Sequence, residues 1–162
     1  GIRLHRRIDA FTNQHDLIRN TCASFPPGLR RYAPIFLDIL GDYYLSQTWD
    51  DYYAETRPQF SQRCYDACTA YAHHLEKTKA PQLHTFLQYM RSSDLLANYH
   101  KWEHVERGLH SVLRRLGQTS LFDAVNIAAD AQRDSGEHAF RLYFSDIRDQ
   151  LPAWATLTAA VQ

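Results

Sequence analysis

The segment from Arg30 to Trp49 constrains the fold of this chain more than any other. It reads RRYAPIFLDILGDYYLSQTW, and its apolar residues fall on nearly every face of a helix with 3.6 residues per turn. This pattern predicts a buried helix. Proline is tolerated only in the first turn, so Pro34 places the start of the regular helix at Tyr32 or Ala33.

Two carboxylates interrupt this apolar segment. Asp38 and Asp42 are four residues apart, so they project from one helix face, and Gly41 between them leaves room for a close neighbour. Aspartates are almost never buried unless they are paired, hydrogen-bonded or bound to a metal. Two explanations stay open: the acids pair with arginines, or they belong to a functional site.

A second pair of polar residues with the same spacing lies near the start of the chain. His5 and Asp9 are four residues apart and are flanked by Ile2, Leu4 and Ile8. An imidazole combined with carboxylates from a facing helix suits a divalent metal such as Mg²⁺, Mn²⁺ or Fe²⁺. Taken alone, the spacing fits a solvated surface pair at least as well.

Helical periodicity continues along the rest of the chain, and no segment shows the sustained alternation that predicts strands. We therefore expect an all-α fold, and a chain of 162 residues with 44% hydrophobic residues predicts a single domain over 1–162, a compact helical bundle. Asp16 is a candidate N-cap for the second helix. The expected helices are 1–13, 16–23, the core helix in 30–49, 61–77, 82–92, 94–99, 102–116 and 121–149, the last broken near 134–136.

The charge of the chain is balanced, with 18 basic and 18 acidic residues, so no global field favours nucleic acid. However, 15 of the basic residues are arginine, whose planar guanidinium suits carboxylates and phosphates. Five of them gather in the first fifth of the chain: Arg3, Arg6, Arg7, Arg30 and Arg31. They predict a local basic surface, although each one alone could equally serve a solvated helix face.

Cysteine usage and hydropathy bear on the compartment. Cys22, Cys64 and Cys68 are an odd number of cysteines without a secretory leader, which favours a reducing compartment, and we expect a cytoplasmic protein. No stretch approaches 18 uncharged apolar residues, so no membrane span is predicted.

The first third of the chain contains three distinctive motifs: His5-Arg6-Arg7-Ile8-Asp9, Arg31-x-Ala33-Pro34-Ile35-x-Leu37-Asp38 and Asp42-x-x-Leu45-x-x-x-Trp49. These motifs resemble those of the acyl carrier protein phosphodiesterases, which look like a helical offshoot of the HD-type phosphohydrolases. The resemblance is strong from Gly1 to Trp49, and beyond about Tyr65 it is a matching order of helices with an apolar Phe140-x-x-Tyr143-Phe144 cluster.

The resemblance implies an HD-domain-like fold and a metal-dependent phosphodiesterase that removes 4′-phosphopantetheine from holo-acyl carrier protein, giving the apo form. A divalent metal, Mn²⁺ or Mg²⁺, would then be held by His5, Asp9 and Asp42, and it would polarise the phosphoryl oxygen and activate a water. Asp38 would be catalytic, together with Arg6 and Arg7, which would offset charge on the phosphate.

Acyl carrier proteins are small and acidic, so the resemblance also assigns partner binding to Arg3, Arg30 and Arg31, with neither nucleic acid nor membrane as a partner. Family members carry a further leader with a His-containing apolar strip and an Asp-Phe-Val motif. The chain begins at Gly1 without that leader, so we expect an incomplete metal site. Two other functions stay open: a nucleotide phosphohydrolase of the HD type, and a non-catalytic helical interaction module.

Overall fold

The computed structural model describes residues 2–73 and 81–159, and within these ranges the chain is helical and has no strand. The all-α prediction is confirmed, whereas the HD-like arrangement stays a prediction. Within the described ranges, three short 3-10 turns join the helices: η1 Arg30–Tyr32, η2 Trp49–Asp51 and η3 Thr119–Leu121. The α-helices are α1 Ile2–Gln14, α2 Asp16–Ser24, α3 Ala33–Gln47, α4 Arg57–His73, α5 Pro81–Ser92, α6 Leu95–Asn98, α7 Trp102–Arg115, α8 Phe122–Arg133 and α9 Gly136–Ala159.

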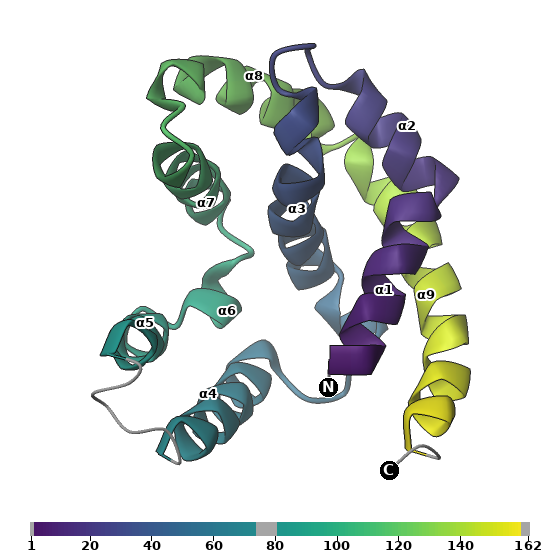
Figure 1. The fold of residues 1–162 in the computed structure, drawn as a ribbon, viewed down its shortest axis with the longest axis vertical. Helices are drawn as coiled ribbons and strands as arrows, with labels where there is room; N and C mark the ends of the chain where they lie inside the picture. Colours follow the sequence, from purple (N-terminus) through teal and green to yellow (C-terminus); the bar gives the residue numbers. More distant parts are fainter. Residues whose placement is uncertain (1, 74–80, 160–162) are drawn as a thin grey trace. The chain divides into compact units, whose positions relative to one another are not determined.

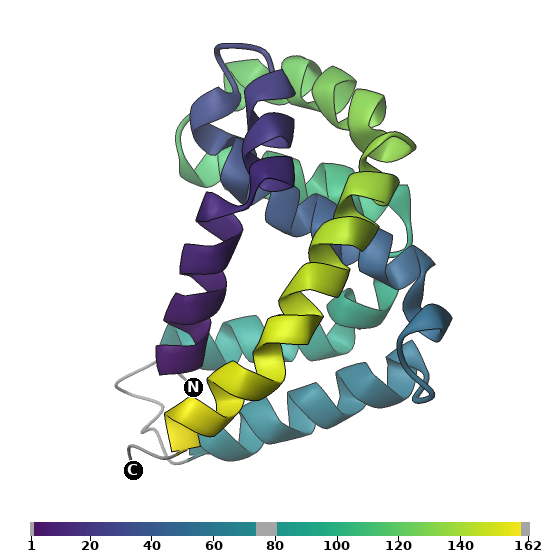
Figure 2. The ribbon, with the colours of Figure 1, turned by 90° about the vertical axis from the view of Figure 1, so that its right-hand side faces the viewer.

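The helices form two compact units, one of residues 1–41 and 109–162 and the other of residues 42–108. In the first unit, α1 and α2 pack along α9 although more than a hundred residues separate them in sequence, and α8 also contacts α9 (Figure 1, Figure 2). In the second unit, α4, α5 and α6 pack against one another (Figure 1). The candidate residues of the N-terminal helices therefore belong mainly to the first unit.

Helix α3 begins at Ala33, as the sequence predicts, but it is not buried on every face. Its buried residues follow one stripe with helical spacing: Ala33, Phe36, Leu40, Tyr43 and Tyr44. On the opposite side Ile35 is 42% exposed, and Asp38 and Asp42 are exposed as well. The prediction of a fully buried helix is wrong, because the two carboxylates keep their access to water rather than incur the cost of burial.

The helix predicted over 102–116 is α7, and most of the apolar residues at helical spacing along it are buried, although Leu116, beyond its end, is 44% exposed. Val105, Leu109 and Leu113 are fully buried, at 0% exposure, and Val112 is nearly so. The helix ends before Gly117, whose positive φ of 68° suits glycine. The stripe is therefore part of the hydrophobic core, as its spacing predicts.

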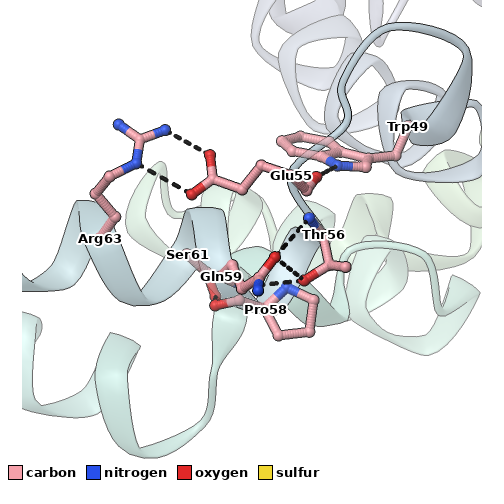
Figure 3. Close-up of polar contacts among 7 residues, drawn as sticks. All are labelled: Trp49, Glu55, Thr56, Pro58, Gln59, Ser61 and Arg63. Atoms are coloured by element: carbon pink, nitrogen blue, oxygen red, sulfur yellow. Dashed lines mark hydrogen bonds and ion pairs between the residues drawn. The ribbon is translucent and has the colours of Figure 1, made fainter.

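Helix α4 begins at Arg57, four residues before the predicted start at Ser61. Thr56 and Gln59 form a capping box: the amide N and Oγ1 of Thr56 lie 3.1 and 2.9 Å from Oε1 of Gln59 (Figure 3). Pro58 falls within the first turn, where its missing N–H costs nothing. The predicted end of this helix, at residue 77, lies outside the described residues.

Two further helix boundaries differ from the sequence-based expectation. His15, not Asp16, is the N-cap of α2, and Asp16 instead lies in the first turn, where its charge complements the helix dipole. Helix α9 continues past Pro152 to Ala159, whereas the break predicted near residue 135 is confirmed between α8 and α9. None of the described helices combines the length and apolarity that a membrane span requires.

Candidate functional site

Helix α1 presents a polar face that carries His5, Asp9 and Thr12. Nε2 of His5 lies 3.4 Å from Oδ2 of Asp9, and the two side chains are 74% and 51% exposed. Thr12 follows Asp9 by three residues, so the two side chains share a helix face. The hydroxyl of Thr12 donates to the carbonyl of Ile8, 2.8 Å away. The structure therefore brings together the predicted pair and adds a hydroxyl beside it.

Asp38 on α3 interacts with this face of α1. Desolvation by the surrounding protein, and then the charge of Asp9, raise the pKa of Asp38, although its side chain keeps access to solvent. No arginine forms an ion pair with Asp38 in the described part of the chain. The explanation by arginine pairing therefore fails for Asp38, and two acids from different helices act on each other instead.

Cys22 on α2 and Tyr143 on α9 complete the cluster. Burial and the charge of Asp38 raise the pKa of the Cys22 thiol. Burial is also the main cause that raises the pKa of Tyr143, and the charges of Asp38 and Asp9 add to it, while the hydrogen bond with Thr12 opposes it. Four helices of the first unit thus contribute to one group of polar side chains, which we name the Asp38 cluster: Asp9, Thr12, Cys22, Asp38 and Tyr143.

The sequence did not single out Thr12, Cys22 or Tyr143 as site residues. Tyr143 stands in an apolar Phe140-x-x-Tyr143-Phe144 cluster, whose pattern predicts a core residue. Of these three residues, Thr12 is the one that the sequence could have indicated as a site residue, because its spacing from Asp9 places it on the same face of α1.

Asp42 belongs to the second unit, where it acts on Tyr99. Burial, and then the charge of Asp42, raise the pKa of Tyr99 to about 12. The assignment of Asp42 as a metal ligand stays a prediction.

A complete metal site is not assembled by the residues that the structure describes. Nowhere in residues 2–73 and 81–159 do three or more His, Cys, Asp or Glu side chains gather closely enough to hold a metal ion. His5 and Asp9 offer two adjacent ligands, both widely exposed to solvent. The described residues therefore fit part of the predicted ligand set and not the whole.

The predicted arginines fall into two kinds. Arg3, Arg6 and Arg7 are exposed on α1, and none of the ion pairs formed within the described ranges includes them. Arg30 donates from Nε to the carbonyl of Phe25, at 2.9 Å. The guanidinium of Arg31 lies 4.4 Å from the centre of the Tyr32 ring. The α1 arginines are available for a partner, whereas Arg30 and Arg31 also support the local structure.

Sequence comparison places these residues in a known family. The profile described as acyl carrier protein phosphodiesterase matches residues 1–147. The chain belongs to the acyl carrier protein phosphodiesterase family. All residues of the Asp38 cluster lie within the matched region. No solved structure matches the chain.

Three relatives of this chain, all named acyl carrier protein phosphodiesterase, show how far the similarity extends. The protein of Photorhabdus laumondii is 37% identical over 84 residues, which is 52% of this chain and 37% of the relative. The protein of Klebsiella pneumoniae is 30% identical over 119 residues, 71% of this chain and 58% of the relative. The protein of Escherichia coli O127:H6 is 26% identical over 154 residues, which is 93% of this chain and 76% of the relative. The chain thus spans less than two thirds of the first two relatives.

Proposed function

We propose that this chain hydrolyses the phosphodiester of holo-acyl carrier protein and releases 4′-phosphopantetheine and the apo protein. The observation that carries the proposal is the family match over residues 1–147, which includes every residue of the Asp38 cluster. The names of the relatives supply the substrate class. The chemistry needs a water to attack phosphorus and a proton for the departing serine oxygen.

The Asp38 cluster has groups suited to both proton transfers. Burial, and then the charge of Asp9, raise the pKa of Asp38, and a raised pKa makes this carboxyl better suited than an ordinary aspartate to protonate the leaving serine oxygen as a general acid. Asp9 is about half exposed, so the carboxylate oxygen that does not bind the proposed metal can accept a proton from the attacking water. Two acids whose environments differ can in this way divide the acid and base roles between them.

Positive charge next to the cluster would offset the charge of the phosphate. Arg6 and Arg7 precede Asp9 by three and two residues and have no acidic partner among the described residues. Arginine donors that meet charge developing in the transition state contribute to catalysis. We assign this role to Arg6 or Arg7, and docking of the acidic carrier protein to Arg3, Arg30 and Arg31.

The proposed function includes a bound divalent metal, Mn²⁺ or Mg²⁺. His5 and Asp9 would hold it, and Mg²⁺ commonly takes one or two protein ligands and completes its shell with waters and substrate phosphate. A metal bound there would polarise the phosphoryl oxygen. Metal analysis of the full-length protein tests this assignment, and full activity after exhaustive dialysis against a chelator would contradict it.

Turnover by the full-length protein tests the function itself. We expect apo-acyl carrier protein and 4′-phosphopantetheine to form from holo-acyl carrier protein, with mass spectrometry as the readout. Efficient cleavage of nucleotides in place of the carrier protein would instead support a nucleotide phosphohydrolase. No turnover of either substrate by metal-loaded protein would support the interaction module.

The docking role of the arginines has its own test. Because long-range charge attraction weakens as salt rises, kcat/KM for holo-acyl carrier protein should fall between about 0.05 and 0.5 M NaCl. Turnover of a small phosphodiester should change much less. The charge reversal of Arg30 and Arg31 to Glu should reproduce the effect of salt. A kcat/KM for the carrier protein that does not respond to salt would show that these arginines do not steer it.

A further inference from the structure

The hydroxyl of Tyr143 donates its hydrogen bond, and this direction follows from its neighbour. Oγ1 of Thr12 lies 2.7 Å from the hydroxyl oxygen of Tyr143. Thr12 has a single hydroxyl hydrogen, and it is donated to the carbonyl of Ile8 at 2.8 Å. Thr12 must therefore accept in its contact with Tyr143, so the phenol is the donor.

Packing around the ring fixes where that donor lies. The ring centre of Tyr143 is 5.3 Å from His15, edge to face, and 6.3 Å from Phe11. His15 is itself held to α9, because its Nε2 lies 3.1 Å from Oδ2 of Asp146, three residues beyond Tyr143. The phenol is therefore positioned by α1 and by the junction of α1 and α2, and it is only half-buried.

Among the groups of the Asp38 cluster that take no part in the proposed proton transfers, Tyr143 is the best neutral donor. Ionised carboxylates can only accept hydrogen bonds and repel an anion, so Asp9 and Asp38 do not bind a phosphate directly while they are charged. The hydroxyl hydrogen of Thr12 is already donated to the carbonyl of Ile8, and the thiol of Cys22 is a weak donor. Burial, and to a smaller extent the charges of both carboxylates, raise the pKa of Tyr143 and so favour its protonated, donating form.

We propose that Tyr143 is a phosphate-binding residue of this site, whose hydroxyl turns from Thr12 to a non-bridging oxygen of the bound phosphodiester. The proposal rests on the proposed function, which supplies the phosphodiester. The exchange is favourable because a neutral hydrogen bond is replaced by a charge-assisted one, which is roughly twice as strong. Thr12 keeps its bond to Ile8, so α1 does not have to move.

Two matched variants separate this role from a structural one. Tyr143→Phe removes the phenolic hydroxyl and keeps the ring, whereas Thr12→Val removes the partner hydroxyl and keeps the side-chain shape. Both break the hydrogen bond between Tyr143 and Thr12, and Thr12→Val also removes the bond to Ile8, so a merely structural role predicts that Thr12→Val costs at least as much. We expect Tyr143→Phe to weaken binding of inorganic phosphate and to lower kcat/KM for holo-acyl carrier protein by about 10- to 100-fold. Thr12→Val keeps the phenol and should lower both values by clearly less than Tyr143→Phe does.

The outcomes distinguish this inference from the proposed function. If the wild-type protein cleaves holo-acyl carrier protein and Tyr143→Phe cleaves it equally well, the function stands and the inference fails. If the wild-type protein cleaves nothing but binds phosphate in a manner that depends on Tyr143, the inference stands and the function fails. Equal losses in the two variants, or no phosphate binding by the wild-type protein, would overturn the inference.

A measurement on the wild-type protein covers the case in which Tyr143→Phe does not fold. With tyrosine rings labelled with ¹³C, the resonance that Thr12→Val displaces most is assigned to Tyr143. Inorganic phosphate should shift that resonance. An unchanged resonance at saturating phosphate would overturn the proposal.

Discussion

Replacement of Asp38 by asparagine should make the protein more stable and less active. Desolvation and the charge of Asp9 raise the pKa of Asp38 above its ordinary value of 3.8, so the folded chain binds this proton more tightly than the unfolded chain does. The ionised side chain is therefore unfavourable in the folded state. Its cost is absent below pH 3.8, grows as the pH rises through the folded pKa, and is complete above it.

The size of the effect follows from the exposure of the two carboxylates. The side chain of Asp9 is 51% exposed and Asp38 also retains access to water, so solvent screens their repulsion. Interactions between exposed charges are on the order of 0.2–1 kcal/mol. For a chain of 162 residues this corresponds to a rise in Tm of up to about 4 °C at neutral pH. Loss of a general acid should lower kcat by about 10²- to 10⁴-fold.

Thermal unfolding followed by circular dichroism, at pH 7 and again near pH 3, measures the first effect, and turnover of holo-acyl carrier protein measures the second. Asp130→Asn is a matched control, because Asp130 is an exposed aspartate on α8 of the same unit, and it should change stability by less than about 0.5 kcal/mol. If Asp38→Asn instead unfolds at a lower temperature than the wild type at pH 7, the carboxylate makes a stabilising contact and the reasoning is wrong.

Three other variants test the remaining assignments. Asp42 is the third metal ligand predicted from the sequence, so Asp42→Ala should abolish hydrolysis while the helical circular dichroism spectrum persists, and normal turnover would end this assignment. Leu40→Ala removes a fully buried side chain from α3 and should lower the free energy of unfolding by about 2–5 kcal/mol in urea titrations; a loss below about 1 kcal/mol would mean that the surrounding core closes the cavity. Thr56→Ala breaks the capping box with Gln59 and should cost about 1 kcal/mol by the same assay, and an unchanged midpoint would show that water replaces the cap.

The sequence alone determined the helical class, most of the helix boundaries and the family. Periodicity of 3.6 residues is a local property, so the order of apolar residues along the chain is enough to predict the core stripe of α7 and the start of α3. The start of α4 was missed because the pattern of apolar residues does not report it, although Thr56-x-x-Gln59 is a capping-box signature that is visible in the sequence. The arrangement of His5 beside Asp9 also followed from spacing along one helix.

Only the tertiary structure decided which groups meet Asp38. Spacing along α3 paired it with Asp42, but helix packing brings Asp9, Cys22 and Tyr143 to it from three other helices of the first unit. The sequence also predicted burial for a carboxylate that the fold leaves open to water. Contacts of this kind depend on how α1, α2 and α9 pack, and packing is set by the shapes of whole helix faces and not by any local motif.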